Sequence, residues 1–280
     1  MRRLRACLSL MSEERVLVDR VLVDGQGAVA HVRLNRPDKR NGLDLPMFEG
    51  LVAAGKALAA DPSVRAVVLS GEGKAFCAGL DFMAFMSSAG AAPRLLAERG
   101  ESPANLAQRV GWVWREVPAP VICAVHGVCF GGGLQIALGA DLRYVHPEAQ
   151  LSVMEIKWGL VPDMGASKTL LSVVPLDVAK ELTFTGRVVS GEEAARLGLA
   201  TRVEADPLAA ALEAARSIAS KSPHAIRAAK RLYEAAPSLG VREAFELETE
   251  LQLGLLGSKN QLEAVQANFE KRAPVFVDPE

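Results

Sequence analysis

The sequence predicts an α/β fold in which a sheet-forming part comes first and a helical part follows. Up to about residue 206, short runs rich in valine and other apolar residues alternate with longer helical stretches. Two of these runs end in glycine-containing turns, and from residue 207 the pattern becomes entirely helical. Such alternation of strands and helices is typical of α/β architecture.

The strand predictions rest on short apolar runs with turn residues on both sides. The clearest are residues 64–69 (VRAVVL) and 121–125 (VICAV), which are rich in β-branched residues. Similar runs occupy residues 29–34 and 149–153. We therefore expect a buried sheet built from these segments.

Helical periodicity appears between the strands and throughout the last part of the chain. Between the strands it covers residues 45–60 and 105–117, and a triple glycine opens a helical segment at residues 134–139. The later helices are expected at residues 208–220, 224–236, 241–256 and 261–272.

These patterns divide the chain into a core of residues 15–206 and a helical region of residues 207–280. No Gly/Ser linker separates them, so the helical region is expected to pack closely on the core. The helix at 241–256 has an apolar face that needs a partner surface, either the protein's own core or another subunit. The residues of that face are Phe245, Leu247, Leu251 and Leu255.

Two turns carry the strongest functional signal. Residues 76–81 (FCAGLD) and 126–135 (HGVCFGGGLQ) each follow a predicted strand. A strand that ends in such a turn and enters a helix leaves unpaired backbone N–H groups directed at one spot. Two such ends that face each other would form an oxyanion hole, which stabilises negative charge on a carbonyl oxygen. The sequence thus predicts an enzyme.

The sequence does not match the glycine-rich motifs of two other classes of enzyme. A phosphate-binding P-loop needs Gly-Lys-Ser/Thr four residues after an earlier glycine, whereas Gly73-Lys74 is followed by Ala75 and preceded at that spacing by Val68. The three spaced glycines of a dinucleotide-binding turn are also absent after Val125. Nucleotide hydrolysis and hydride transfer therefore lose their main sequence support.

The amino-acid composition limits the classes of binding partner that we expect. The chain has 280 residues, 50% of them hydrophobic, and a formal net charge of −1. This balance indicates neither nucleic-acid binding nor membrane-surface binding. The sequence contains no run of about eighteen apolar residues, so no membrane span is predicted. The four cysteines and four histidines show no metal-ligand spacing, so no metal site is expected.

The cellular location is predicted from the cysteines and from the first residues. Cysteines without a disulfide pattern favour reduced thiols in a cytoplasmic compartment. Residues 1–14 begin with a basic, briefly apolar stretch that is too short and too polar for a usual signal core. We interpret them as a disordered extension of a cytoplasmic protein, with a mitochondrial address as the alternative.

Several motifs together resemble the crotonase superfamily, the enoyl-CoA hydratase/isomerase family of acyl-CoA enzymes. The resemblance covers about residues 29–203, and its motifs are residues 34–44 (LNRPDKRNGLD), the two glycine turns, 141–144, 151–165 (LSVMEIKWGLVPDMG) and 182–201. It implies a spiral of ββα units followed by a helical trimerisation region, with a homotrimer or hexamer as the assembly. It also implies an acyl-CoA thioester substrate, so that coenzyme A belongs to the substrate and no separate cofactor is needed.

By this resemblance the oxyanion-hole donors are the backbone N–H groups of Leu80 and Gly132. Hydratases of the family carry two glutamates, whose positions here are occupied by Gln135 and Glu155. Glutamine cannot exchange a proton at neutral pH, although its amide can hold a water molecule. This departure puts the two-glutamate hydration mechanism in doubt.

The resemblance also assigns a second acid. Family members that isomerise 3,5-dienoyl thioesters have an acid at the position of Asp163, and they usually have one where this chain has Gln135. Two carboxylates can take a proton from one carbon and return it at another. The leading hypothesis is double-bond isomerisation with Glu155 and Asp163 as the proton-transfer pair.

Alternatives stay open at this point. Hydration by Glu155 with a water held by Gln135 is the second hypothesis, and acyl-CoA binding without turnover is the third. Asp163 is equally suited to cap a helix that starts near residue 165. Glu155 has the structural alternative of an ion pair, with Lys157 or with an arginine.

Coenzyme A has a phosphate-rich end that basic residues can contact. The resemblance points to Arg36 and Lys39 in an early loop and to Lys271 near the C-terminus. For the adenine and pantetheine it points to the backbone of Ala78, Leu80, Asp81 and Phe82. Four residues, Phe82, Met83, Phe85 and Met86, are candidates to line the acyl pocket or to belong to the core.

Overall fold

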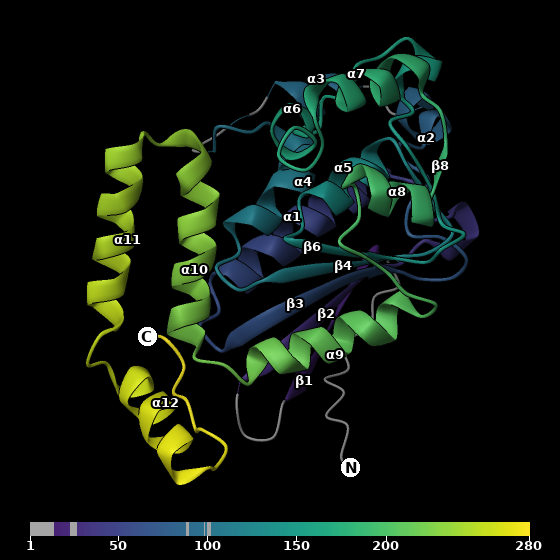
Figure 1. Ribbon diagram of the computed structural model, residues 1–280. Helices are drawn as coiled ribbons and strands as arrows, with labels where there is room; N and C mark the ends of the chain where they lie inside the picture. The colour runs from purple at the N-terminus through teal and green to yellow at the C-terminus, as the bar shows by residue number, and fades with distance from the viewer. Residues whose placement is uncertain (1–13, 23–26, 88–89, 98, 100–101) are drawn as a thin grey trace.

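The computed structural model describes residues 14–22, 27–87, 90–97, 99 and 102–280. The predicted disordered extension, residues 1–14, lies outside this part of the chain except for its last residue. Within the described residues the strands form a six-stranded and a three-stranded sheet, and helices cover both faces of the larger one (Figure 1). The predicted α/β class is confirmed.

The larger sheet has the strand order β1-β2-β3-β4-β6-β9. β1 pairs antiparallel with β2, and every later pair is parallel. The strands are β1 (Val16–Leu22), β2 (Ala28–Leu34), β3 (Val64–Gly71), β4 (Val121–Val125), β6 (Leu142–Val145) and β9 (Arg202–Val203). Parallel pairing brings the carboxyl ends of β3 and β4 to one edge, where the two glycine turns begin.

The smaller sheet has the order β5-β7-β8 and extends the structure beyond that edge. Its strands are β5 (Val128–Phe130), β7 (Gln150–Ser152) and β8 (Val189–Ser190). β5 follows β4 after a two-residue turn and pairs in parallel with β7, so that Cys129 lies opposite Leu151. This pairing places the start of the triple glycine next to the end of β7.

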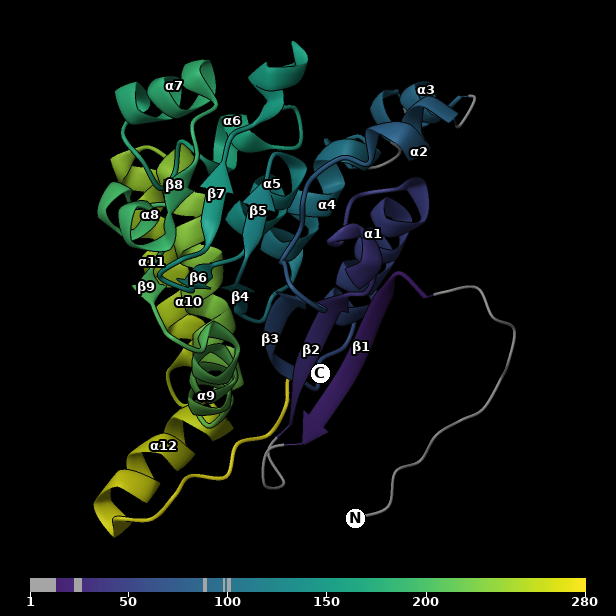
Figure 2. The same cartoon turned by 90° about the vertical axis from the view of Figure 1, so that its right-hand side faces the viewer.

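Helices pack on the two faces of the larger sheet (Figures 1 and 2). One face is covered by α1 (Leu45–Ala59), α4 (Leu106–Glu116) and α5 (Gly132–Leu138), and the other by α9 (Pro207–Ala219). The remaining helices are η1 (Pro37–Lys39), α2 (Phe82–Ser87), α3 (Ala91–Leu96), η2 (Glu155–Trp158), α6 (Ala166–Thr169), α7 (Leu176–Thr185), α8 (Gly191–Leu197), α10 (Pro223–Ala235), η3 (Ala236–Ser238), α11 (Val241–Leu255) and α12 (Lys259–Glu270).

The side chains at the centre of β3 alternate between two apolar clusters, which explains the apolar run of residues 66–69. Val67 and Leu69 point into the large core under α1 and α4, whereas Ala66 and Val68 pack against α9. A strand buried on both faces has no polar side. Across the described residues, no helix combines the length and the apolar character that a bilayer crossing requires.

Local signals in the sequence determine where the covering helices begin. Asp44 caps α1 by accepting a hydrogen bond from Met47 N at 3.1 Å. Asn105 and Gln108 form a reciprocal capping box at the start of α4. Both devices satisfy backbone N–H groups that the first turn of a helix leaves unpaired.

The four predicted C-terminal helices are confirmed to within about two residues of their expected ends. The first of them, α9, belongs structurally with the core, because its Ala211, Ala215 and Ala219 are buried against the sheet. Two ion pairs, each with a buried cation and a partly exposed aspartate, connect the rest of this region to the core. Lys230 Nζ on α10 lies 2.7 Å from Asp141 Oδ2, and Arg65 Nε on β3 lies 2.7 Å from Asp278 Oδ1. The expected close packing is confirmed for α9, whereas α10, α11 and α12 bury few residues.

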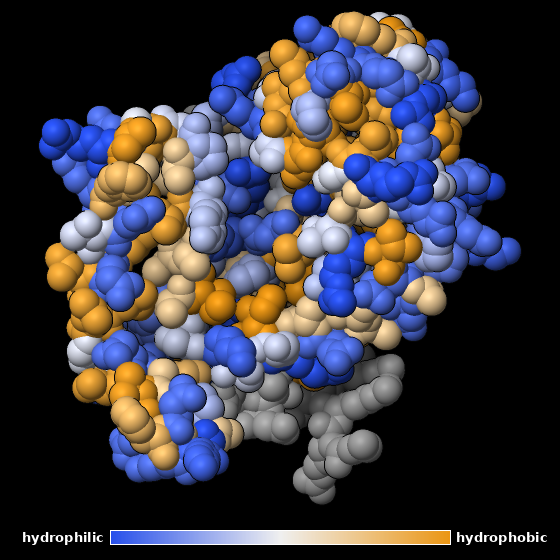
Figure 3. Space-filling model, in the orientation of Figure 1, coloured by the Kyte–Doolittle hydropathy of each residue, from blue (hydrophilic) through white to orange (hydrophobic). Residues whose placement is uncertain are grey.

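Helix α11 is the clearest exception to the close packing. It packs on α10, and its Leu247, Leu251 and Leu255 are half-buried, but Phe245 is 61% exposed. Figure 3 shows apolar side chains gathered at the left edge of the molecule, where α11 lies. A role of this helix in oligomerisation stays a prediction.

Candidate active site

The first glycine turn lies between β5 and the segment that precedes α1. On one side Cys77 N donates to Val128 O at 3.1 Å, and Phe130 N donates to Cys77 O at 3.0 Å. On the other side Leu43 N donates to Gly79 O at 2.8 Å. The two turns singled out in the sequence are therefore direct neighbours in the fold.

Gly79 shows how closely the turns approach. Its φ is +86°, and a Cβ there would lie 2.7 Å from Phe130 O and 3.6 Å from Gly132 N. Backbone atoms cannot move aside as a flexible side chain can. Only glycine fits this position without displacing the second turn.

Among the described residues, the backbone N–H groups of Leu80 and Gly132 are unpaired donors, one in each turn. Leu80 follows Gly79, and Gly132 is the first residue of α5. In the described part of the chain neither N–H donates to a backbone carbonyl, whereas the neighbouring Asp81 N and Gly131 N both do. Two unpaired N–H groups on adjoining turns are suited to hold a carbonyl oxygen as it gains charge.

The triple glycine brings different groups close to this spot. A Cβ at Gly131 would lie 3.3 Å from Glu155 Oε1, and one at Gly132 would lie 2.8 Å from Met164 Sδ. A Cβ at Gly133 would meet the backbone and side chain of Cys77. A carboxylate, an apolar side chain and the first turn thus all pack against three consecutive residues.

Glu155 begins η2, separated by two residues from the end of β7, and is only 9% exposed. Its Oε1 accepts a hydrogen bond from Gln135 Nε2 at 2.6 Å, and its Oε2 is buried without a partner among the described residues. No described cation pairs with it, and Lys157 Nζ lies instead 5.7 Å from the centre of the Trp158 ring. The alternative of a structural ion pair is therefore wrong.

Burial governs the protonation of this carboxyl group. It raises the pKa of Glu155 above the ordinary value, and the nearby Asp163 carboxylate raises it further, against the opposing hydrogen bond from Gln135. The Asp163 side chain reaches solvent, yet partial burial of its carboxyl also raises its pKa. Two acids with raised pKa values in one site are suited to proton transfer near neutral pH.

Asp163 lies in the segment between η2 and α6. The N-cap of α6 is Gly165, with φ at +100°, and no side chain caps this helix. The alternative that Asp163 serves as the cap is therefore wrong. Its carboxylate acts electrostatically on Glu155 instead.

Gln135 lies on the first turns of α5 and is 2% exposed. Its Nε2 donates to Glu155, and its Oε1 accepts from Met164 N at 2.7 Å and from Ala166 N at 3.3 Å. Both ends of the amide are therefore engaged by protein groups. The prediction that this amide holds a water molecule stays a prediction.

Asn41 supports the site and was missed in the sequence. It is completely buried, with φ at +55°, a conformation that asparagine tolerates better than most residues. Its Nδ2 donates to Ala75 O at 2.9 Å and to Phe76 O at 3.1 Å, and its Oδ1 accepts from Arg36 N at 2.8 Å. The signal was the Asn-Gly pair at residues 41–42, which marks a tight turn.

Cys77 is a second supporting residue. Its thiol donates to Asn41 O at 3.1 Å and accepts from Gly79 N at 3.4 Å. Burial raises the pKa of this thiol to about 12, so it stays protonated and keeps its donor. The thiol therefore orders the turn that carries Leu80.

The structure brings most of the residues predicted to contact coenzyme A together. Arg36 Nη1 lies 2.7 Å from Asp81 Oδ2, so its charge is paired across the turn. Ala78 N donates to Arg40 O at 2.9 Å, and Lys39 is exposed on η1. The Phe82 ring lies 4.3 Å from that of Trp158, centre to centre.

Lys271 is not brought to this group within one chain. It is the C-cap residue of α12, which lies at the opposite end of the molecule from α2 (Figure 2). A contact between Lys271 and a coenzyme A bound at its own chain's turns has no support from this arrangement. The coenzyme A contacts as a set stay predictions.

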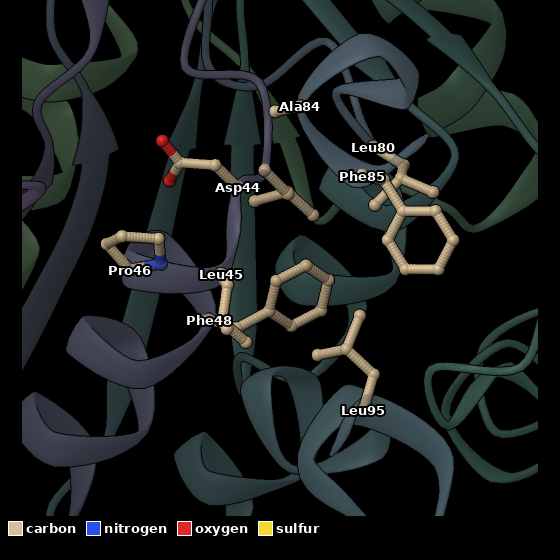
Figure 4. Close-up of a pocket in the computed structure, with 9 residues that line it drawn as sticks. Asp44, Leu45, Pro46, Phe48, Leu80, Ala84, Phe85 and Leu95 are labelled. Carbon is tan, nitrogen blue, oxygen red and sulfur yellow. The ribbon is translucent and has the colours of Figure 1, made fainter. Parts of the chain in front are cut away.

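An apolar cavity of about 160 Å³ adjoins the side chain of Leu80 (Figure 4). Phe85 points into it from α2, and Phe48 and Leu95 line it from α1 and α3. Met83 and Met86 are largely exposed instead. Of the four residues suggested for an acyl pocket, Phe85 is the one that lines this cavity.

Comparison with known proteins identifies the family of this chain. A sequence profile described as enoyl-CoA hydratase/isomerase matches residues 24–279. The chain belongs to the enoyl-CoA hydratase/isomerase family. In the part of this family member that the structure describes, no group of three or more His, Cys, Asp or Glu side chains could hold a metal ion.

Curated relatives of this enoyl-CoA hydratase/isomerase family member carry two kinds of name. The mitochondrial Delta(3,5)-Delta(2,4)-dienoyl-CoA isomerase of Mus musculus is 33% identical over 90% of this chain and 79% of that protein. A putative enoyl-CoA hydratase of Thermus thermophilus is 37% identical over 90% of this chain and 98% of that protein. The names support an acyl-CoA enzyme and leave the reaction open.

Solved structures confirm the fold of this family member. A crystal structure of enoyl-CoA hydratase from Bacillus anthracis superimposes with a TM-score of 0.84 at 27% identity, over 92% of this chain and 98% of that one. A putative enoyl-CoA hydratase from Streptomyces coelicolor A3(2) does so with a TM-score of 0.83 at 33% identity, over 99% of both chains. The predicted crotonase-like fold is confirmed.

Proposed function

We propose that this enzyme shifts double bonds of an enoyl-CoA or dienoyl-CoA thioester. The observation that carries the proposal is the buried carboxyl group of Glu155 next to the glycine turn of one unpaired amide, with the Asp163 carboxylate near enough to act on it and a glutamine where a second glutamate would serve hydration. Isomerisation moves one proton within the substrate and needs no water.

In the proposed mechanism the thioester oxygen accepts hydrogen bonds from Leu80 N–H and Gly132 N–H. Glu155, the acid next to Gly131, removes a proton from the carbon alpha to the carbonyl, and the electron pair forms an enolate. In a 3,5-dienoyl substrate this enolate is conjugated to the last double bond. Protonation at its far end by Asp163 yields the 2,4-dienoyl product, with atoms and charge balanced.

The proposed roles agree with the electrostatics of the site. A base that works near neutral pH benefits from a pKa above the usual carboxyl range, and burial raises that of Glu155. Losing one donor of an oxyanion hole typically costs about 2.7–4 kcal/mol of transition-state stabilisation. The name of the mouse relative describes the same reaction for that protein.

Hydration is the second candidate, because several relatives and structural neighbours are named enoyl-CoA hydratases. In that reaction Glu155 would activate the water, because it is the only ionisable residue at the two positions, 135 and 155, where hydratases carry glutamates. Binding of acyl-CoA without turnover is the third candidate. The buried carboxyl group of Glu155 argues against it, because a binding protein gains nothing from an unpaired carboxylate oxygen.

Mass spectrometry in heavy water separates these functions. Purified protein is incubated with 2-enoyl-CoA and 3,5-dienoyl-CoA thioesters, and the products are separated and weighed. An isomer that carries one deuterium supports isomerisation, whereas a product heavier by one heavy-water molecule supports hydration. Bound but unchanged thioesters would contradict both and favour a binding protein.

Matched variants assign the acids in the same assay. Asp163→Asn is expected to lower deuterium incorporation at the far end of the diene, while exchange at the alpha carbon persists. The control is Asp177→Asn, an exposed aspartate on α7, which is expected to behave as wild type.

We further propose that the protein assembles as a homotrimer or hexamer through its C-terminal helices. The proposal is supported by the exposed apolar side chains of α11, among them Val241, Phe245 and Leu253. Native mass spectrometry gives the mass of the assembly directly. A monomer at micromolar concentration would contradict this part of the proposal.

A further inference from the structure

Two aromatic side chains connect the segment of one oxyanion donor with the segment of the proposed base. The rings of Phe82 and Trp158 lie 4.3 Å apart, centre to centre, with 33° between their planes. Phe82 follows the donor residue Leu80 by two positions, and Trp158 follows Glu155 by three. The ring pair therefore joins two parts of the site that must act on the same thioester.

We propose that Phe82 and Trp158 are positioning residues, whose contact sets the distance between the amide of Leu80 and the carboxyl group of Glu155. Neither ring takes part in the proton transfer itself. This inference rests on the proposed function and deepens it, because it names the contact that aligns the donor with the base.

The first step of the argument is that the Phe82 ring is tied to the turn of Leu80. Phe82 is the first residue of α2, and the preceding Asp81 accepts a hydrogen bond from Ala84 N through its Oδ1 at 3.1 Å. Asp81 N also donates to Leu43 O at 3.0 Å. A displacement of the ring should therefore move the turn with it.

The second step is that Trp158 is tied to Glu155 in a similar way. These two residues are the first and the last of η2. Leu160 N donates to Glu155 O at 3.1 Å. Gly159 N donates to Ile156 O at 3.0 Å, so the backbone folds back on the base directly after the indole. The position of the indole thus follows that of the Glu155 backbone.

The third step concerns the other contacts between the two segments. Among the described residues, no hydrogen bond or ion pair joins residues 80–87 directly to residues 155–163. Each segment has its own polar partners, Arg36 for the first and Gln135 for the second. The ring pair therefore supplies a direct link that these polar contacts do not.

The exposure of Trp158 shows that burial in the core does not explain its placement. It is 53% exposed, although tryptophan is highly buried on average. Apart from Phe82, the contact described for the indole is with the ammonium group of Lys157, 5.7 Å from the ring centre. Aromatic pairs attract each other beyond the area that they bury. The contact with Phe82 therefore holds the indole at the surface of the site.

Small displacements matter at this place. A thioester whose oxygen is held by Leu80 N–H and whose alpha carbon faces Glu155 lies between the two segments. A misplacement of about 1 Å can cost about 10²-fold in rate. Loss of the ring contact should thus lower kcat, whereas KM, which includes the many contacts of the coenzyme A part, should change much less.

A double-mutant cycle tests the link. We expect Phe82→Leu and Trp158→Leu each to lower kcat by about 10-fold to 10²-fold, while thermal melts show folded proteins. The double variant should lose no more than either single variant, because residues in contact that act as one unit are not additive. Losses that multiply would show that the two rings act independently and would overturn the inference.

Trp158→Phe is the conservative variant, and Tyr233→Leu is the matched control. Phenylalanine can still pack on Phe82, so Trp158→Phe should recover most of the kcat that Trp158→Leu loses. Tyr233 on α10 is 75% exposed, and no ring in the described part of the chain pairs with it. We expect its replacement to leave kcat unchanged. An equal loss in this control would make the effect a general one and overturn the assignment.

Tryptophan fluorescence provides a readout without turnover. Trp158 is exposed, whereas Trp114 is buried and Trp112 half-buried. Binding of a saturated thioester, butanoyl-CoA, should change the wild-type emission, because the ligand enters between the two segments. Trp158→Phe should lose this change although calorimetry still shows binding. Emission that is unaffected by bound butanoyl-CoA would overturn the inference. If this signal appears but no thioester is isomerised, the proposed function fails while the contact of the ring pair with the ligand site is supported.

Discussion

The active site and the C-terminal helices are held together by different means. Around the glycine turns, short buried polar groups such as Asn41, Cys77 and Gln135 bind backbone atoms at close range. In the helical region from α10 to the C-terminus, long charged side chains form the contacts with the core instead. The ion pair of Lys230 and Asp141 is an example. The backbone of the two glycine turns is closely packed, whereas α11 leaves apolar side chains exposed.

This difference predicts which substitutions should change catalysis and which should change stability or assembly. At the glycine turns, an added Cβ would collide with backbone atoms, so a substitution should disturb the position of the oxyanion donors before it unfolds the protein. In the helical region, a lost ion pair weakens packing at a distance from the acids. The expected effects decrease in the order that follows.

The largest effect is expected for Glu155→Gln. Glutamine keeps the shape of the side chain but cannot accept the alpha proton, so kcat should fall by about 10²–10⁴-fold. Steady-state kinetics with the preferred thioester measure the loss. Turnover at the wild-type rate would remove Glu155 from the mechanism.

The same variant should be more stable than wild type at neutral pH. Burial raises the pKa of Glu155 in the folded protein, so its ionisation costs stability as pH rises above the unfolded value of about 4.3. A neutral glutamine does not carry this cost. Thermal melts should therefore show an advantage of the variant that is absent below that pH and grows toward neutrality.

Gly79→Ala should reduce kcat/KM by about 10²–10³-fold, the cost of losing one oxyanion donor. The new Cβ would lie 2.7 Å from Phe130 O and would push the turn of Leu80 away from Gly132. Kinetics on the folded variant check this effect. Gly90→Ala is the matched control, because Gly90 also has positive φ but its Cβ would meet no atom within 4 Å.

Lys230→Met tests the other region. Methionine removes the cation that Asp141 and two carbonyl oxygens contact, and breaking a buried pair typically costs about 3 kcal/mol or more of unfolding free energy. Urea denaturation measures the loss, and kcat of the folded fraction should stay unchanged. A fall in kcat without a loss of stability would contradict the separation of the two regions.

A smaller effect is expected in the pH dependence. Wild-type activity should fall on the acid side with a midpoint above 4.5, because Glu155 must be ionised and its pKa is raised. Asp163→Asn removes a negative charge that contributes to this rise. The midpoint of the residual alpha-proton exchange, followed by NMR in heavy water, should therefore move to lower pH, and a move to higher pH would contradict the coupling.

The smallest effect on stability is expected for Phe245→Asp on α11. The side chain is exposed in the single chain, so the unfolding free energy of the monomer should change by no more than about 0.5 kcal/mol. Native mass spectrometry should show loss of the assembly if α11 forms the subunit interface. An unchanged assembly would place the interface elsewhere.

Strands and late helices were predictable because their signals are local. The apolar runs at β3 and β4 and the periodicity of α9 to α12 agree with the structure. β1 was not predicted. It lies at the edge of the sheet, and its sequence VLVDRVL places charged residues between the apolar ones, which weakens the signal of a buried strand.

The site was predictable in part. The sequence indicated Leu80 and Gly132 on two glycine turns, and the structure brings those turns together through β5. It did not reveal that Asn41 holds the first turn, or that Arg36 pairs with Asp81. Those contacts join segments that are far apart along the chain, and no local pattern encodes them.

By itself the sequence determined the fold class, the family and the residue types available for chemistry, because apolar periodicity, glycine turns and the change from glutamate to glutamine are local properties of the chain. Only the tertiary structure decided that the pKa of Glu155 is raised, which groups Gln135 binds, and that Asp163 does not cap a helix. Burial and hydrogen-bond partners depend on which distant segments pack together, and that packing is a property of the whole fold.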